Sequence, residues 1–346
     1  MQIRLATSAD QGCWDDYVGN HPEGTAYQLF AWKNAVKKAY GFEGPYLLAQ
    51  KGSTVCGILP LIDFSIPFFK KSLISLPYCD AGGVLADDCE TADKLLEEAV
   101  ALASKTDAIV HVRSTRELPF FSINTTEKVR MLLDLPESSE IFFSGLKSKL
   151  RTKIKKPLKH GYEVKLGSCE FIDHFYAVFA ENMHELGSPV HSRKWIEAIV
   201  SEYQEKVKIA VVFAPEGIPV AAGMILLHPT TVSNPWASSL RKYNYMKPNM
   251  LLYSTLLSFA SDHGYKKFDF GRSTPGEGTY QFKEQWGAQP HPLYWYGSDE
   301  KNRPTETSGK VASNLNKREL LARAWKHIPV SSANWLGPKI RRYISL

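Results

Sequence analysis

IAVVFAPEGIPVAAGMILL, residues 209–227, holds two apolar runs separated by a turn at Pro215-Glu216-Gly217. Short apolar runs bounded by a turn predict two antiparallel strands. A helical pattern precedes them from Trp195 to Tyr203, and another follows over 249–263. The short strand pattern 267–270 ends the series. A further strand pattern, 236–240, lies between the hairpin and the second helix. The order helix, hairpin, strand, helix, strand predicts an α/β fold with a mixed sheet covered by helices.

The first half of the chain repeats this order. PYLLAQKGSTVCGILPLI, residues 45–62, is a second hairpin pattern and follows a helical pattern from Trp32 to Tyr40. A helical pattern over 91–104 then leads to the strand pattern 108–112. Arg113-Ser114-Thr115 follows this strand, as Arg272-Ser273-Thr274 follows the strand of the second half. Matches in the same order predict two copies of one fold.

The length of 346 residues also favours two domains over one. We predict a first domain at 1–145, a second at 146–300, and a basic linker with a C-terminal helix at 301–346. The polar stretch 298–313 is typical of a linker or loop. Residues 315–328 form an amphipathic pattern, with Leu320, Leu321, Ala324, Trp325 and Ile328 on one side. We expect this helix to pack on the first domain; the alternative is peripheral membrane contact through its basic, amphipathic character.

Composition narrows the class of protein. With 44% apolar and 23% charged residues, the chain is typical of a folded globular protein. It has no apolar run of 18 residues and no basic-then-apolar leader at its N-terminus, so we expect a cytoplasmic protein. The five cysteines lack CxxC spacing and predict free buried thiols in a reducing compartment, with no metal site.

The net charge of +6 is unevenly spread. Residues 301–346 hold ten Lys/Arg and two Asp/Glu, a local charge of +8, which leaves about −2 for the rest. This distribution does not predict a DNA-binding protein. The other basic concentration, 147–159, holds seven Lys/Arg and no acid. It is either the solvated face of a linking helix or an arm for the phosphates of a nucleotide-linked acceptor or a tRNA-borne donor.

The segment 268–287 holds the densest set of candidate functional residues. Asp269 lies between two phenylalanines, and a Gly-rich loop leads to Lys283. Asp269 is either buried in an ion pair or cap, or functional; Arg272 is either its partner or a clamp for an anionic substrate. Lys283 is either a surface lysine on an aromatic patch or a cation that stabilises an oxyanion. Tyr280 of the same loop is a candidate for substrate binding.

His191 and Arg193 lie just before the helix that contains Trp195. A helix N-terminus attracts anions, so the two residues are candidates for substrate binding; the alternative is a surface loop with a Ser192 cap. The sequence has no GxSxG, no paired histidine motif, no GxGxxG and no P-loop. It therefore predicts no serine triad, no zinc hydrolase and no dinucleotide site.

The chain as a whole resembles the FemAB-like proteins, and most nearly their branch at PEP-CTERM/exosortase and exopolysaccharide loci. The resemblance lies in Trp32, 46–49, 57–61, 75–78, Gly82-Gly83, 186–192, Trp236 with 237–239, 268–273, 282–287 and 335–338.

This resemblance implies two tandem GNAT-like (N-acetyltransferase-like) domains. It implies transfer of an aminoacyl group from aminoacyl-tRNA to an amine of a peptidoglycan precursor. The family's catalytic lysine, in a Phe-Lys pair, corresponds to Lys283. Its phosphate-binding lysine falls at Lys33 or Asn34, and its substrate-binding arginine falls at or near His191 to Arg193. Trp236 belongs to one of the shared motifs and is a further candidate for substrate binding.

The sequence thus predicts an N-acyltransferase that acts on an amine of a cell-envelope or exopolysaccharide precursor. This glycan precursor is a small molecule or is lipid- or nucleotide-linked. The alternative is a non-catalytic binding or assembly protein of polysaccharide/exosortase systems on a transferase scaffold. We expect no tightly bound cofactor. The donor is aminoacyl-tRNA or an acyl-CoA or other acyl carrier, although residues 241–263 contain none of the glycines that let a backbone approach the CoA pyrophosphate closely.

Overall fold

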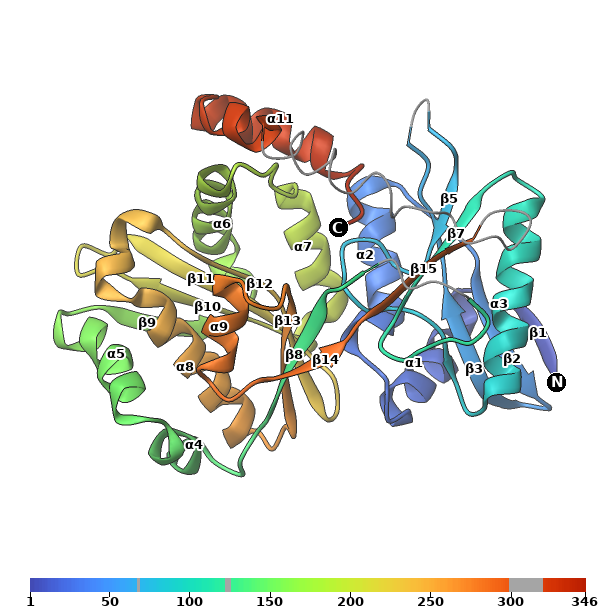
Figure 1. The fold of residues 1–346 in the computed structure, drawn as a ribbon, viewed down its shortest axis with the longest axis horizontal. Helices are drawn as coiled ribbons and strands as arrows, with labels where there is room; N and C mark the ends of the chain where they lie inside the picture. The colour runs from blue at the N-terminus through green and yellow to red at the C-terminus, as the bar shows by residue number, and fades with distance from the viewer. Residues whose placement is uncertain (67–68, 122–125, 299–319) are drawn as a thin grey trace. The chain divides into compact units, whose positions relative to one another are not determined.

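The computed structural model describes residues 1–66, 69–121, 126–298 and 320–346 (Figure 1). The chain divides into two compact units. Unit 1 comprises Met1–Arg130, His291–Ala312 and Tyr343–Leu346, and unit 2 comprises Met131–Pro290 and Ser313–Arg342. The predicted boundaries near 145 and 300 differ from this division, because 131–145 belongs to unit 2 and the chain returns to unit 1 at His291.

Unit 2 is built on a seven-stranded sheet. The strand order is β14 (Gln289–Pro292), β8 (Val129–Asp134), β13 (Lys267–Ser273), β12 (Thr231–Ser239), β11 (Pro219–Leu227), β10 (Val207–Phe213) and β9 (Glu163–Gly167). β10 and β11 form the predicted hairpin, with Ile209 opposite Met224. β12 runs antiparallel to β11 and parallel to β13, so the predicted mixed sheet is confirmed.

Helices cover both faces of this sheet. The helices of unit 2 in the described ranges include α4 (Ser139–Gly145), α5 (Ser148–Lys159), α6 (Ile172–Leu186), α7 (Arg193–Tyr203), α8 (Pro248–Asp262), α9 (Gly278–Glu284) and α11 (Val330–Arg341). Figure 1 shows α6 and α7 on one side of the strands and α5 and α8 on the other. Residues 220–227 of β11 are all buried, as expected for a strand with helices above and below it.

Unit 1 contains two four-stranded sheets. One has the order β1 (Gln2–Leu5), β2 (Tyr46–Lys51), β3 (Thr54–Pro60), β6 (Leu85–Ala86), and the other β15 (Tyr294–Ser298), β7 (Ile109–Ser114), β5 (Ser72–Ile74), β4 (Ile62–Asp63). Its helices include α1 (Gln11–Asn20), α2 (Phe30–Tyr40) and α3 (Cys89–Ser104). β15 comes from residues that the sequence assigns to the second domain, and it pairs with β7.

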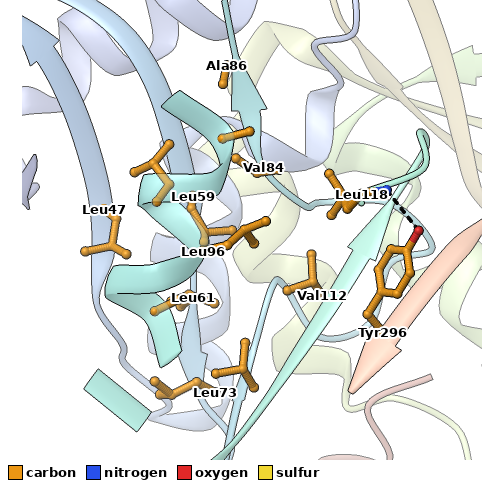
Figure 2. Close-up of a cluster of buried hydrophobic side chains, with 14 of the residues drawn as sticks. Leu47, Leu59, Leu61, Leu73, Val84, Ala86, Leu96, Val112, Leu118 and Tyr296 are labelled. Atoms are coloured by element: carbon orange, nitrogen blue, oxygen red, sulfur yellow. Dashed lines mark hydrogen bonds between the residues drawn. The ribbon is translucent and has the colours of Figure 1, made fainter. Parts of the chain in front are cut away.

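The core of unit 1 forms where α3 packs on the strands (Figure 2). Leu96 of α3 belongs to one buried cluster with Leu47, Leu59 and Val112. The hydroxyl of Tyr296, from β15, accepts a hydrogen bond from the Leu118 N–H at 3.0 Å. Residues almost 180 positions apart therefore share one core.

The internal duplication is visible in the strand pairing. In unit 1, β5 and β7 pair in parallel from Ser72–Ile109 to Ile74–His111. In unit 2, β12 and β13 pair in parallel from Thr231–Lys267 to Ser233–Asp269. Each parallel pair is separated along the chain by one long helix, α3 or α8, and each follows a hairpin, β2–β3 or β10–β11. The predicted order of elements is confirmed in both copies.

The C-terminal segment corrects a prediction. α11 packs on α6, and the range Ser313–Arg342, which includes α11 and the predicted helix at 315–328, belongs to unit 2 and not to unit 1. The predicted amphipathic helix at 315–328 is described from Leu320. Trp325 is buried, but Leu320 and Leu321 are 68% and 69% exposed, so its apolar side is only partly covered. The predicted linker at 298–313 lies, apart from Ser298, outside the described residues.

The five cysteines are free thiols. Cys56 and Cys79 are buried, whereas Cys13, Cys89 and Cys169 are exposed. The expectation that all five are buried is therefore wrong, because three of them lie on surface positions of helices or helix starts.

Candidate active site

Two parallel strands of unit 2 diverge after a short pairing. β12 and β13 are paired at three positions, ending at Ser233 and Asp269. β12 nevertheless continues to Ser239, and β13 continues to Ser273. Beyond the pairing, the facing strand edges present peptide groups that this ladder does not use. Three of these groups are used by side chains of the protein: the carbonyls of Gly271 and Arg272 accept from Lys283, and that of Trp236 accepts from Asn234.

A cavity of about 310 Å³ lies at the end of β12. Its volume fits a small acyl group or a short chain, at the lower end for ligand pockets. Three elements contribute its walls: the end of β12, the first turns of α8, and α9. The lining residues are Ala237, Ser238, Ser239, Asn249, Leu252, Tyr253, Gly278, Thr279, Phe282 and Lys283.

Lys283 supplies a buried cation to this cavity. Its side chain is on the same face of α9 as Thr279, because residues four apart on a helix are neighbours. The residue is only 8% exposed. Its Nζ donates hydrogen bonds to the carbonyl oxygens of Gly271 at 3.1 Å and Arg272 at 2.7 Å. The end of β13 therefore fixes the position of the ammonium group at the cavity wall.

Asp269 holds the backbone that binds Lys283. The Gly271 N–H donates a hydrogen bond to Oδ1 of Asp269 at 2.8 Å. Gly271 has φ +73°, a left-handed conformation that favours glycine. Asp269 is 3% exposed, so this bond lies inside the protein. The structure thus brings together Asp269, the backbone of Arg272 and Lys283, three of the residues singled out in the sequence.

Tyr253 is a cavity residue that the sequence reasoning missed. It stacks on Phe270 with ring centroids 5.5 Å apart and lies 5.0 Å from the ring of Phe282. Burial raises the pKa of its hydroxyl above the ordinary range. Asn249 and Ser238 were also missed. Asn249 and Tyr253 are four residues apart at the start of a helix, a spacing that could have indicated one shared face.

His191 and Trp236 belong to a neighbouring aromatic cluster. The His191 ring lies 5.9 Å from Trp195 and 6.0 Å from Trp236, and Trp236 lies 6.3 Å from Phe179. Burial, together with the nearby Arg341, holds the pKa of His191 well below its ordinary value. His191 and Trp236 do not line the cavity, although Trp236 directly precedes the lining residue Ala237.

Three further residues that the sequence predicted for substrate binding, Arg193, Tyr280 and Lys33, do not line the cavity. Arg193 is half-exposed and forms ion pairs with Asp173 at 2.6 Å and Glu197 at 3.4 Å. Tyr280 is on α9 but does not line the cavity. Lys33 belongs to unit 1, where its Nζ lies 4.3 Å from the centroid of the Tyr46 ring. Burial lowers the pKa of this lysine.

In unit 1 the corresponding divergence of strands is filled by the chain itself. Beyond the pairing of Ile74 with His111, the Ser75 N–H donates to the His111 carbonyl at 2.8 Å. The Arg113 N–H donates to Ser75 Oγ at 2.8 Å, and the Gly82 N–H donates to the Arg113 carbonyl at 3.1 Å. The 75–82 segment thus uses the strand edge in unit 1.

The basic run 147–159 contains the helix α5, which lies beside the cavity elements. Lys153 Nζ donates to Gln285 Oε1 at 3.2 Å, just after α9. Lys156 Nζ donates to the Tyr245 carbonyl at 2.7 Å, just before α8. The run therefore places positive charge next to the two helices that form the cavity walls.

Comparison with known proteins agrees with this architecture. Residues 144–284 match the acetyltransferase (GNAT) domain family, a range that includes Lys283. FemX is similar to 86% of this chain and 97% of its own, with 15% identity and a TM-score of 0.68. The fold is a tandem GNAT fold. The tandem GNAT protein of the clavulanic acid pathway is also similar, over 88% of this chain and all of its own, at 11% identity and a TM-score of 0.52.

L-PGS from Bacillus licheniformis is a further structural relative. It is similar over 79% of this chain and 87% of its own, at 15% identity and a TM-score of 0.51. No curated protein sequence matches the chain significantly. The expectation of two tandem GNAT-like domains is thus confirmed, while the PEP-CTERM branch remains a prediction.

Proposed function

We propose that the protein is an N-acyltransferase whose active site is the unit 2 cavity. The observation that carries this proposal is the buried ammonium of Lys283 at the wall of a cavity formed by the end of β12, the first turns of α8, and α9. A positive charge held in place before the reaction stabilises negative charge that develops in the transition state. Positioning and charge stabilisation are the main needs of amine attack on an activated acyl group.

In the proposed reaction, a neutral amine of the acceptor attacks the carbonyl carbon of the donor. The new C–N bond forms, and the carbonyl oxygen becomes negative in the tetrahedral intermediate. Lys283 stabilises this oxyanion through its charge. The bond from carbon to the leaving oxygen or sulfur then breaks, and the proton lost by the amine ends on the departing alcohol or thiol. Asp269 acts through the Gly271 turn and keeps Lys283 in position.

We propose that the donor carries phosphate, as aminoacyl-tRNA or an acyl carrier. Two features support this. The N-terminus of α8 borders the cavity at Asn249, and helix N-termini favour anions. The α5 lysines Lys153 and Lys156 lie beside the cavity helices. The resemblance to FemAB-like proteins supports an acceptor amine on a lipid- or nucleotide-linked precursor of the cell envelope or of an exopolysaccharide.

The test has a binding step and a transfer step. Melting temperature is measured with acetyl-CoA, longer acyl-CoAs and charged tRNA. Transfer of labelled acyl group to candidate amines is then measured with any donor that binds. Lys283→Met removes the charge at similar volume, and Lys266→Met is the control, since Lys266 is an exposed lysine of the same unit. We expect Lys283→Met to bind the donor and to lose roughly 100-fold or more in rate, the usual effect of losing one oxyanion-stabilising group.

Three outcomes contradict the proposal. One is equal rates for Lys283→Met and wild type. Another is an equal loss in both lysine variants. The third is no shift with any donor at well above micromolar concentration, together with a Lys283→Met strain that keeps the cellular function. This last result would favour the alternative of a binding or assembly protein on a transferase scaffold.

A further inference from the structure

We propose that residues 320–342 of unit 2 form a docking surface for an anionic lipid bilayer. We call these residues the C-terminal surface. The inference is independent of the proposed catalysis, because it uses no residue of the cavity. No helix within the described ranges, 1–66, 69–121, 126–298 and 320–346, is long and apolar enough to span a membrane. The proposed contact is therefore with the surface of the bilayer.

The first observation is charge. From 320 to 346 the sequence contains five basic residues and no aspartate or glutamate. The basic residues are Arg323, Lys326, Lys339, Arg341 and Arg342. Clusters of basic residues bind membranes that expose anionic headgroups, and their attraction weakens as salt rises.

The second observation is the orientation of α11. Its inner side is fixed by Ala333 and Gly337, which are buried. A Cβ at Gly337 would lie 3.1 Å from the Val190 backbone nitrogen, so the helix sits close to its own unit there. Trp335 is on the other side and is 67% exposed, with Lys339 Nζ 3.3 Å from its ring centroid. α11 therefore presents a tryptophan next to a cation on its outer face.

The third observation is a second exposed apolar group on the same segment. Trp325 anchors the described helical residues after position 320, and its ring lies near Gly337. Leu320 and Leu321 instead have most of their surface exposed. Exposed large apolar side chains that are grouped in one segment indicate an interaction surface. Tryptophan and leucine among lysines and arginines are typical of helices that lie in the membrane interface.

The basic surface of α5, also in unit 2, lacks such a group of exposed apolar side chains. α5 buries Leu150 and Ile154 and exposes lysines such as Lys149 and Lys159, with Leu158 as its one exposed large apolar side chain. That pattern suits a polyanion that needs charge alone. The C-terminal surface adds apolar groups, which have no use against a phosphate backbone but can enter a bilayer.

The test is sedimentation of the full chain with vesicles of phosphatidylcholine alone or with one quarter phosphatidylglycerol. We expect binding to the anionic vesicles at least roughly tenfold stronger than to the neutral ones, and weaker at high salt. Lys339→Ala/Arg342→Ala should reduce this binding roughly 30-fold, at about fivefold per basic residue. Trp335→Ala and Leu320→Ser/Leu321→Ser should each reduce it at least roughly tenfold, because apolar area no longer enters the interface.

Matched controls make the result specific. Lys149→Ala/Lys159→Ala removes two charges from α5, and Leu5→Ser removes an exposed leucine of unit 1; both should bind vesicles like wild type. Lys283→Met should also bind normally, which separates this proposal from the catalytic one. Because Leu5, Lys149, Lys159, Leu320, Leu321, Trp335 and Lys339 are exposed, variants at these positions alone should keep the wild-type melting temperature.

The proposal is overturned if neutral and anionic vesicles bind equally, or if the α5 variant loses binding while the α11 variants keep it. It is also overturned if no vesicle binds but the Lys339/Arg342 variant loses binding to RNA, since the surface would then serve a nucleic acid.

Discussion

Arg113 of β7 should contribute several kcal/mol to the stability of unit 1, and Arg113→Ala tests this. The side chain is 5% exposed. Its guanidinium donates to the carbonyls of Leu76 at 3.0 Å, Cys79 at 3.1 Å and Ser345 at 3.0 Å, and to Ser345 Oγ at 2.9 Å. Leu76 and Tyr78 have left-handed backbone, with φ +64° and +68°. Arg113 therefore holds a turn that non-glycine residues adopt at a cost.

The size of the effect follows from these contacts. Hydrogen bonds from a charged group contribute about 1.5–3 kcal/mol each, and burial of the guanidinium offsets part of that sum. A left-handed non-glycine residue costs about 1–2 kcal/mol, which the turn can release once Arg113 is gone. Together these effects predict a loss of about 3–5 kcal/mol for Arg113→Ala, the range for breaking a buried charged network.

The free energy of unfolding is measured by urea denaturation, with hydrogen exchange of β7 amides to report on unit 1 separately. Ser345→Ala removes one of the four bonds and should cost only about 1 kcal/mol. Removal of Tyr343–Leu346 should shrink the effect of Arg113→Ala, because two of its bonds are then already lost. A cost below about 1 kcal/mol for Arg113→Ala would refute the reasoning, as would full additivity with the deletion.

Three further predictions concern the fold. Burial and the neighbouring Arg113 lower the pKa of His111 to about 4, so the folded state binds this proton more weakly than the unfolded chain. The free energy of unfolding should therefore fall by up to about 3 kcal/mol as the pH drops from 6.5 toward 4. His111→Asn should flatten this part of a plot of urea midpoint against pH. Gly57→Ala places a Cβ 2.7 Å from Thr91 Cγ2 and should destabilise unit 1 by about 1–3 kcal/mol. Gly12→Ala lies in open space on α1 and should stabilise the protein by up to about 1 kcal/mol. A higher melting temperature for Gly57→Ala than for Gly12→Ala would contradict this. Lys247 has φ +63° before α8, so Lys247→Gly should raise the melting temperature, and Lys247→Ala should not.

Much of the fold was predictable because its signals are local. The hairpin over 209–227 shows in two apolar runs and a turn, and the α8 helix shows in its apolar spacing up to Gly264. The duplication was predictable for the same reason, since the same local patterns recur in the same order. In the candidate site, Asp269 and Lys283 stood out because charged residues are rare among so many aromatic neighbours.

The substrate-binding predictions were less informative about the cavity. His191 and Trp236 are near each other, but they form an aromatic cluster beside the cavity. Tyr253 and Asn249 line the cavity, yet a sequence pattern alone does not separate a helix face that packs on a sheet from one that borders an opening. That difference depends on where β12 and β13 stop pairing, which involves residues about 36 positions apart.

By itself, the sequence determined the type and order of the elements and the presence of two related copies, because helix and strand periodicities are properties of neighbouring residues. Only the tertiary structure decided that β15 completes a sheet of unit 1 and that α11 packs on α6. It also decided that the lysine of α9 is buried against the end of β13. Strand partners and helix contacts are chosen by the total apolar surface and backbone hydrogen bonding that the folded chain can satisfy, and no local segment carries that information.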